Sequence, residues 1–246
     1  MNDKVEKLEN DLLECIGKFK DRIENSPIKE DYMRDLLIPY KVFNLTRFDD
    51  TKISFDNVKS IIENYTTTEG VKIEEILKAY HIAKSYEFIE KYLEGKEDEL
   101  LKSSAFSYYS DEDADFDFIG FDVITSIGNI ISQDTPSDSI DLVATRLSNF
   151  INNNIMQGAD CSVLAEFVIK FLEQKPFSKY NEEICAILVD YMITKLGYLG
   201  CIIFKRDYNL FKLSADSGRE AVEEFLMREI KKTYELGLKI LEDINK

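Results

Sequence analysis

Residues 164–205 read LAEFVIKFLEQKPFSKYNEEICAILVDYMITKLGYLGCIIFK and carry the clearest structural pattern in the chain. Before Pro176, apolar residues at three- and four-residue steps predict a helix with Cys161, Leu164, Val168 and Phe171 on one face. After Pro176, a second helix that ends at Gly197 carries Ile184, Leu188 and Tyr191. Residues 201–204, with the sequence CIIF, have the composition of a β-strand. We therefore expect two consecutive helices joined by residues 175–181.

Helical spacing also dominates the rest of the chain. The expected helices have their apolar positions within residues 5–23, 28–37, 58–62, 73–93, 140–151 and 222–234. Ser26 and Pro27 are typical of a helix start, and Pro39 should end the helix that follows them. Ser54 is a suitable N-cap for the next helix.

One segment departs from this spacing. Apolar residues surround the dipeptide Gly128-Asn129, which suggests a tight turn, and they include Phe121, Val123, Ile124, Ile127, Ile130 and Ile131. We expect a β-hairpin over residues 121–132. The fold class is therefore mainly α, a helical bundle with one inserted hairpin. Residues 1–38 should form an N-terminal helical extension, and residues 39–246 the principal helical domain.

Composition restricts the partners. The 246 residues include 47 acidic and 31 basic side chains, with a formal net charge of -16, so the protein should repel nucleic acid and anionic membranes. No run is long and apolar enough to cross a membrane, and the start MNDKVEKLEND does not resemble a signal peptide. We expect a cytoplasmic protein whose partner is another protein, and a homo-oligomer is compatible with the sequence.

Three sets of residues are candidates for chemical sites. Four cysteines lie far apart in apolar stretches, which favours reduced core residues over a metal site: Cys15, Cys161, Cys185 and Cys201. His81 is the single histidine and lies in a helical run, so packing is a better interpretation than catalysis. Residues 111–117 space carboxylates two apart but lack the glycine and glutamate of a calcium loop, which favours a solvated acidic loop.

Residues 164–205 resemble the centre of a Fic/Doc (Fido) domain. In that family a helix ends in H-P-F-x-[D/E]-G-N-G-R-x-x-R, the next helix begins inside this motif, and a phrase like L-x-x-x-G-Y-P-x-x-I-I follows. Residues 53–93 look like the helices that precede the motif, and the hairpin expected over 121–132 falls where the family has its β-hairpin flap. The resemblance covers residues 43–235.

Most positions of the motif differ from the family's pattern. Lys175 stands at the histidine and is followed by Pro176 and Phe177; Lys179 stands at the acidic metal-binding position, Tyr180 and Glu182 at the glycines, Asn181 at the asparagine, and Glu183 and Ala186 at the arginines. The resemblance implies that the general base is missing, because a lysine is protonated at neutral pH. It also implies that Glu182 and Glu183 repel nucleotide phosphates and that Lys179 repels magnesium.

The family's inhibitory segment, [S/T]-x-x-x-E-[G/N], has its nearest match in residues 46–50, but the arginine that its glutamate would pair with is Ala186 here. Three functions are compatible with the sequence. The leading hypothesis is a non-catalytic binding or regulatory module that binds neither ATP nor magnesium, with a protein partner docked on the flap at Phe121, Val123, Ile127 and Ile130. The alternatives are a Fido-fold transferase with an altered active site, and an unrelated helical interaction protein.

Overall fold

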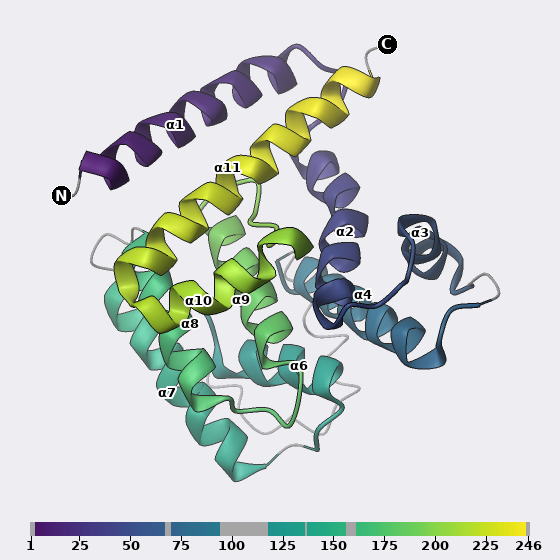
Figure 1. The fold of residues 1–246 in the computed structure, drawn as a ribbon, viewed down its shortest axis with the longest axis vertical. Coiled ribbons are helices and arrows are strands. Elements are labelled where there is room, and N and C mark those ends of the chain that lie inside the picture. The colour runs from purple at the N-terminus through teal and green to yellow at the C-terminus, as the bar shows by residue number, and fades with distance from the viewer. Residues whose placement is uncertain (1–2, 67–69, 94–117, 136, 156–160, 245–246) are drawn as a thin grey trace.

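The computed structural model describes residues 3–66, 70–93, 118–135, 137–155 and 161–244 (Figure 1). Helices account for nearly all regular structure in these ranges. In chain order the elements are α1 (Asp3–Glu24), α2 (Glu30–Thr46), the 3-10 helix η1 (Arg47–Asp49), α3 (Phe55–Asn64), α4 (Ile73–Leu93), α6 (Phe121–Ser132), α7 (Asp138–Ile155), α8 (Cys161–Gln174), α9 (Asn181–Lys195), η2 (Lys205–Asp207), α10 (Tyr208–Ser217) and α11 (Arg219–Ile244).

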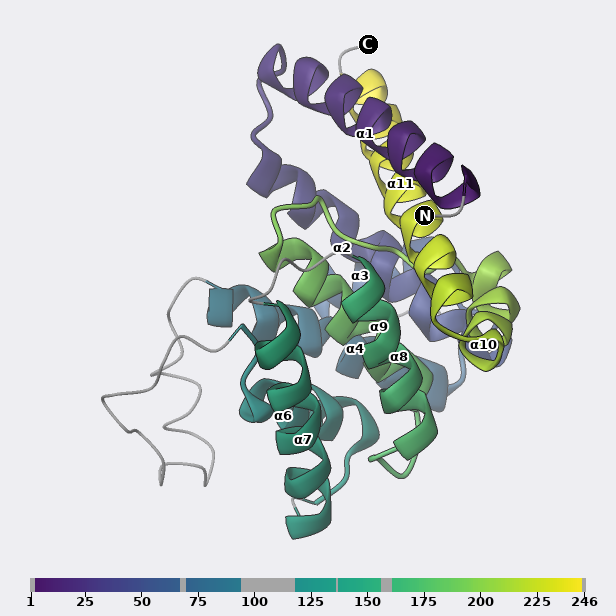
Figure 2. The same ribbon diagram turned by 90° about the vertical axis from the view of Figure 1, so that its left-hand side faces the viewer.

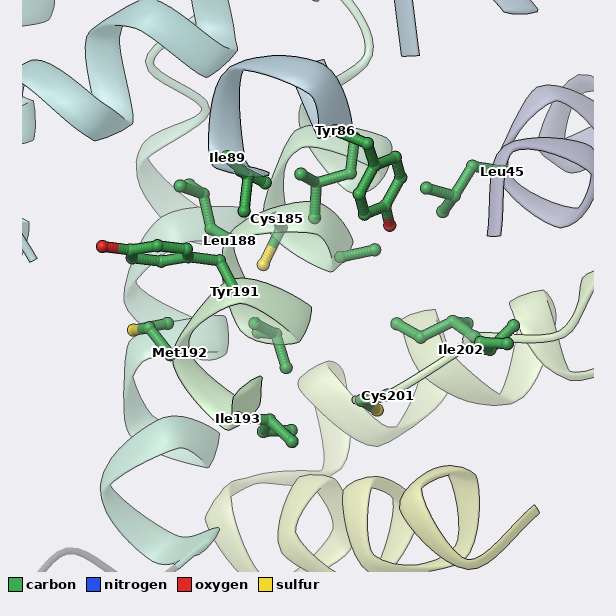
Figure 3. Packing of buried hydrophobic residues seen from close by; sticks show 14 of the residues in the cluster. Leu45, Tyr86, Ile89, Cys185, Leu188, Tyr191, Met192, Ile193, Cys201 and Ile202 are labelled. Atoms are coloured by element: carbon green, nitrogen blue, oxygen red, sulfur yellow. The ribbon is translucent and has the colours of Figure 1, made fainter. Parts of the chain in front are cut away.

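Helix α9 runs through the middle of the molecule (Figure 1). All but one of its residues from Asn181 to Ile193 are buried, so it has no solvent face, as expected of a helix that is apolar on nearly all sides. Figure 3 shows its side chains packed between α4, α2 and the segment before α10. The residues labelled there include Leu45, Tyr86, Ile89, Cys185, Leu188, Tyr191, Met192, Cys201 and Ile202.

Helix α1 lies along the outer side of α11, and the two run in the same direction (Figure 2). Two ion pairs show this register: Lys231 lies 3.8 Å from Asp11 near the middle of both helices, and Arg22 lies 3.9 Å from Glu242 near their C-terminal ends. The apolar face predicted for residues 5–23 is the face that α1 buries, with Phe19 fully enclosed. Helix α2 then crosses residue 39 without a break.

The expectation that Pro39 ends a helix was wrong. Helix α2 begins at Glu30, with Lys29 as its N-cap, and continues through Pro39 to Thr46. Proline removes one backbone hydrogen bond and strains the preceding turn. Burial of Val42 and Leu45 beyond the proline favours continuation of the helix. Ser54 does cap α3, because its hydroxyl accepts the N–H of Asn57 at 3.1 Å.

The β-hairpin expected over residues 121–132 was also wrong, because this segment is helix α6. Val123, Ile127 and Ile131 recur at four-residue steps and are buried on one face of the helix. Gly128 lies inside the helix, and the left-handed residue is the C-cap Gln133, with a φ of 58°. No strand occurs in the ranges that the structure describes, so a strand edge for partner docking is not present there.

Residues 201–204, which the sequence indicated as β-like, form neither a helix nor a strand, and side chains bind several N–H groups in and beside this segment. Cys201 N donates to Asp190 Oδ1 at 2.7 Å, and Ile202 N to Thr233 Oγ1 at 2.9 Å. Leu199 N donates to the Tyr234 hydroxyl at 3.0 Å. These bonds satisfy the backbone of a buried segment without a sheet.

Lys41 of α2 adds an ion pair to this arrangement. Its ammonium lies 2.8 Å from the Asp190 carboxylate, and both side chains are buried. The pair joins α2 to α9 inside the core. The acidic run over residues 111–117 lies outside the described residues. No described helix is long and apolar enough to cross a membrane.

Candidate functional site

The joint between α8 and α9 spans residues 175–180, as the sequence predicted. Its backbone is left-handed at Lys175, with a φ of 42°, and at Tyr180, with a φ of 61°. The Asn181 side chain closes the turn, because its Oδ1 accepts the Phe177 N–H at 3.1 Å and its Nδ2 donates to the Phe177 carbonyl at 2.7 Å. Asn181 therefore satisfies the backbone of Phe177, which gives this motif residue a structural role.

Helix α6 and the segment after it lie against this joint. The Phe177 ring is buried beside Gly128, where an added Cβ would lie 1.9 to 2.4 Å from ring carbons. Asp134 accepts the Ser178 N–H at 2.8 Å and the Ser178 hydroxyl at 2.5 Å. The segment expected to be a flap is thus at the expected place, but it has a different structure.

The apolar residues assigned to the flap mostly face the core. Val123 and Ile127 are fully buried, Ile130 is half-buried, and Phe121 is 36% exposed. Because the segment is a helix with its backbone groups bonded internally, it offers no row of N–H and C=O groups to an incoming strand. Docking by strand addition at these residues is therefore contradicted.

Lys175, Pro176 and Lys179 lie at the outer side of the joint. Both lysines are exposed and Pro176 is half-buried. The Lys179 ammonium lies 5.2 Å from the centre of the Tyr180 ring. Partial burial and, secondly, the Lys179 charge lower the pKa of His81, so this imidazole is mainly neutral at pH 7. The structure thus brings His81 near the joint, which the sequence did not predict.

Glu182 and Glu183 lie in the first turn of α9, and they differ in burial. Glu182 is half-buried, whereas the Glu183 side chain is 3% exposed and forms an ion pair with Lys78 of α4, itself 4% exposed. Burial raises the pKa of Glu183, while Lys78 and the N–H of Glu183 itself stabilise the carboxylate and oppose this shift. A negative charge already lies against the N-terminus of α9, where unpaired N–H groups and the helix dipole favour an anion.

Lys78 connects the Glu183 carboxylate to a second carboxylate, that of Asp49. Its ammonium also binds Asp49 of η1 and lies 4.8 Å from the centre of the Tyr180 ring. A pocket of about 260 Å³ adjoins the cluster, and its lining includes Asp49, Asp50, Glu74 and Glu75 against Lys72 and Lys78. Carboxylates outnumber ammonium groups in this lining, so its charge disfavours a phosphate.

Residues 46–50, the nearest match to an inhibitory segment, form the end of α2 and η1. Asp49 pairs with Lys78, and Asp50 pairs with Lys205 at 2.6 Å. Thr46 donates its hydroxyl to the Val42 carbonyl. Ala186, at the position of the arginine that this segment would pair with, is buried in α9. Asp49 of this segment is therefore linked to Glu183, in the first turn of α9, through Lys78 of α4.

The cysteines agree with the core interpretation. Cys15, Cys185 and Cys201 are buried, Cys161 is partly exposed, and none of the four forms a disulfide. Burial raises the pKa of Cys185 and Cys201 well above the usual range, so both stay protonated thiols. Among the described residues, no three His, Cys, Asp or Glu side chains are grouped as metal ligands.

Sequence reasoning missed Lys78, although a signal was present. Lys78 stands one turn before Ile82 and two turns before Tyr86, on the face of α4 that is otherwise apolar. Lys41 likewise lies on a buried face of α2, one turn after Leu37 and one turn before Leu45. A lysine on a buried helix face needs an acidic partner. By this rule each lysine requires a buried carboxylate, and the structure shows these to be Glu183 for Lys78 and Asp190 for Lys41.

The order of helices and the α8–α9 joint define a helical protein with the Fic (Fido) fold. The Fic-1 structure from C. elegans has a TM-score of 0.70 at 14% identity, and the match covers 98% of this chain and 73% of that one. A Fic domain containing signaling protein from Bacteroides thetaiotaomicron VPI-5482 has a TM-score of 0.68 at 11% identity, covering 95% and 98%. A Fic family protein from Desulfovibrio desulfuricans G20 has a TM-score of 0.60 at 10% identity, covering 98% and 75%.

At these identities the matches establish the fold alone. Neither the models of known protein families nor the curated protein sequences match this chain. The structural matches span nearly all of this chain, so they contradict an unrelated helical fold. The resemblance in residues 164–205 therefore identified the fold correctly.

Proposed function

We propose that this chain is a non-catalytic member of the Fic fold, a binding or regulatory module that uses neither ATP nor magnesium. The observation that carries the proposal is the Glu183 carboxylate, buried at the N-terminus of α9 and compensated by Lys78. A nucleotide phosphate at this helix end would have to displace or approach that carboxylate. Two negative charges this close repel each other, and Lys78 already divides its single positive charge between Glu183 and Asp49.

The residues around the joint support the same proposal. Lys179 places an ammonium at the position where the resemblance calls for an acidic metal ligand, and a cation there repels magnesium. Lys175 stands in place of the expected histidine and is exposed at the outer side of the joint. The residues at the joint therefore do not suit a magnesium nucleotide. The cellular partner in this proposal is a protein, and the compartment is the cytosol.

Isothermal titration of ATP with magnesium into the purified chain tests the proposal. We expect no magnesium-dependent, saturable heat at millimolar nucleotide. Micromolar, magnesium-dependent ATP binding that disappears in Asn181→Ala would overturn the proposal, provided that the variant keeps its helical circular dichroism. A matched control is Asn154→Ala, because Asn154 is also a helical asparagine but lies on α7.

The competing function is a Fido-fold transferase with an altered active site. An assay with labelled ATP and other labelled donors against a whole lysate separates the two. Label transferred by the unchanged protein and lost in Lys175→Ala would establish the transferase and make this lysine catalytic. Transfer that is absent in both proteins agrees with the non-catalytic module.

A further inference from the structure

A pocket of about 400 Å³ lies between α4 and the C-terminal end of α6. Its lining comes from one face of α4 and from the last turn and C-cap of α6, namely Tyr80, His81, Lys84, Glu87, Phe88, Lys91, Ile130 and Gln133. It shares no lining residue with the pocket beside Lys78 and Glu183. Its size falls in the range that small-molecule sites occupy.

The charge of this lining is opposite to that of the protein. Lys84 lies 2.6 Å and Lys91 lies 2.9 Å from the same Glu87 carboxylate, so two ammonium groups share one negative charge. The Lys179 charge acts on His81 from the neighbouring joint. In a chain of net charge -16, this local excess of lysine makes the pocket a preferred position for an anion.

The lining also offers an apolar surface. The Tyr80 and Phe88 rings and the Ile130 side chain are partly buried around the pocket. The Lys84 ammonium lies 5.7 Å from the centre of the Tyr80 ring, which holds this cation beside an aromatic surface. A pocket with apolar walls and a few charged groups selects a ligand with an apolar body and one charged end.

We propose that the pocket between α4 and α6 binds a small aromatic or aliphatic anion, a carboxylate or phosphate of metabolite size. Lys84 and Lys91 bind the anionic group, and Phe88 and Ile130 contact the apolar body. This proposal does not rest on the non-catalytic function, because the pocket shares no lining residue with the N-terminus of α9. Its failure would leave that function untouched.

The single histidine provides a site-specific readout. His81 lines the pocket, so its imidazole C2–H resonance in proton NMR reports binding without labelling of other groups. The probes are phenyl phosphate, phenylacetate and inorganic phosphate. We expect a saturable shift with phenyl phosphate or phenylacetate, and an increase of the His81 pKa when the anion is bound, because a negative charge stabilises the imidazolium. The comparison of the two aromatic probes distinguishes a phosphate ligand from a carboxylate ligand.

Variants locate the binding. Lys84→Gln with Lys91→Gln should weaken the better aromatic probe about tenfold or more, a change of about 1.4 kcal/mol in binding free energy. Lys170→Gln should leave the affinity unchanged, because Lys170 forms a similar pair with Glu166 and lies over the Phe150 ring but belongs to α8. Ile130→Ser should weaken the aromatic probes but not inorganic phosphate. Retained helical circular dichroism confirms that each variant is folded.

Three results would overturn the proposal. The first is the absence of a saturable His81 shift with both aromatic probes. The second is an equal loss of affinity in the Lys170→Gln control, which would indicate general screening of charge. The third is binding of inorganic phosphate as tight as that of phenyl phosphate, which would exclude the apolar contact.

Discussion

The Phe177 ring occupies the space beside Gly128 that any larger side chain would need. This contact joins the α8–α9 joint to α6, two segments about 50 residues apart in the chain, and Asp134 reinforces it through Ser178. It explains why a glycine stands inside a helix, where it lowers helix stability. The position of α6 at the joint thus depends on the absence of a side chain at residue 128.

Gly128→Ala should therefore destabilise the protein. The new methyl group would overlap the Phe177 ring, and overpacking of this kind costs about 1–3 kcal/mol, which exceeds the gain in helix propensity. Urea unfolding followed by circular dichroism measures the change. Gly17→Ala in α1 is the control, since nothing lies within 4 Å of a Cβ there and the substitution should stabilise the protein slightly. Equal effects of the two substitutions would contradict the contact.

Lys78→Met should be strongly destabilising. The substitution leaves the Glu183 carboxylate buried beside α4 without its cation, and removal of one partner from a buried pair costs about 3–5 kcal/mol. Adding Glu183→Gln to Lys78→Met should recover part of this loss, because the uncompensated charge disappears. Lys170→Met, which breaks an exposed pair with Glu166, should cost less than about 1 kcal/mol. A double variant as unstable as Lys78→Met alone would show that the pair is not the cause.

Glu183 also predicts a dependence of stability on pH. Its pKa in the folded protein is raised above 4.5 by burial, so the folded state binds this proton more tightly than the unfolded state does. The contribution of protonated Glu183 to the stability of the folded protein is therefore greatest at low pH, and it is lost as the pH rises through the pKa in the folded state. The free energy of unfolding of the protein relative to Glu183→Gln should increase as the pH falls toward 4.5. A constant difference, measured by urea unfolding at several pH values, would show that Glu183 has an ordinary pKa.

Local sequence patterns predicted the helices and the joint better than they predicted α6 and the buried charges. Apolar spacing located α8 and α9, because their buried faces repeat at the helical period. Gly128-Asn129 suggested a turn, but Gly128 is required by Phe177 of the distant α8–α9 joint, and no local pattern records that contact. Likewise, the pairing of Lys78 with Glu183 depends on how α4 packs against α9. The same limit applies to the pocket at His81, which is formed by two helices.

Lys175→His should not create transferase activity. It restores the side chain that the resemblance assigns to the general base, yet transfer from labelled ATP to lysate proteins should remain undetectable. A base acts only on a substrate held beside it, and the Glu183 carboxylate and the Lys179 ammonium still disfavour a magnesium nucleotide. Adding Lys179→Asp and Glu183→Arg tests this reason, because together they reverse both charges. Transfer by Lys175→His alone would show that neither charge blocks the site. Transfer by the triple variant only would identify Lys179 and Glu183 as the cause of inactivity.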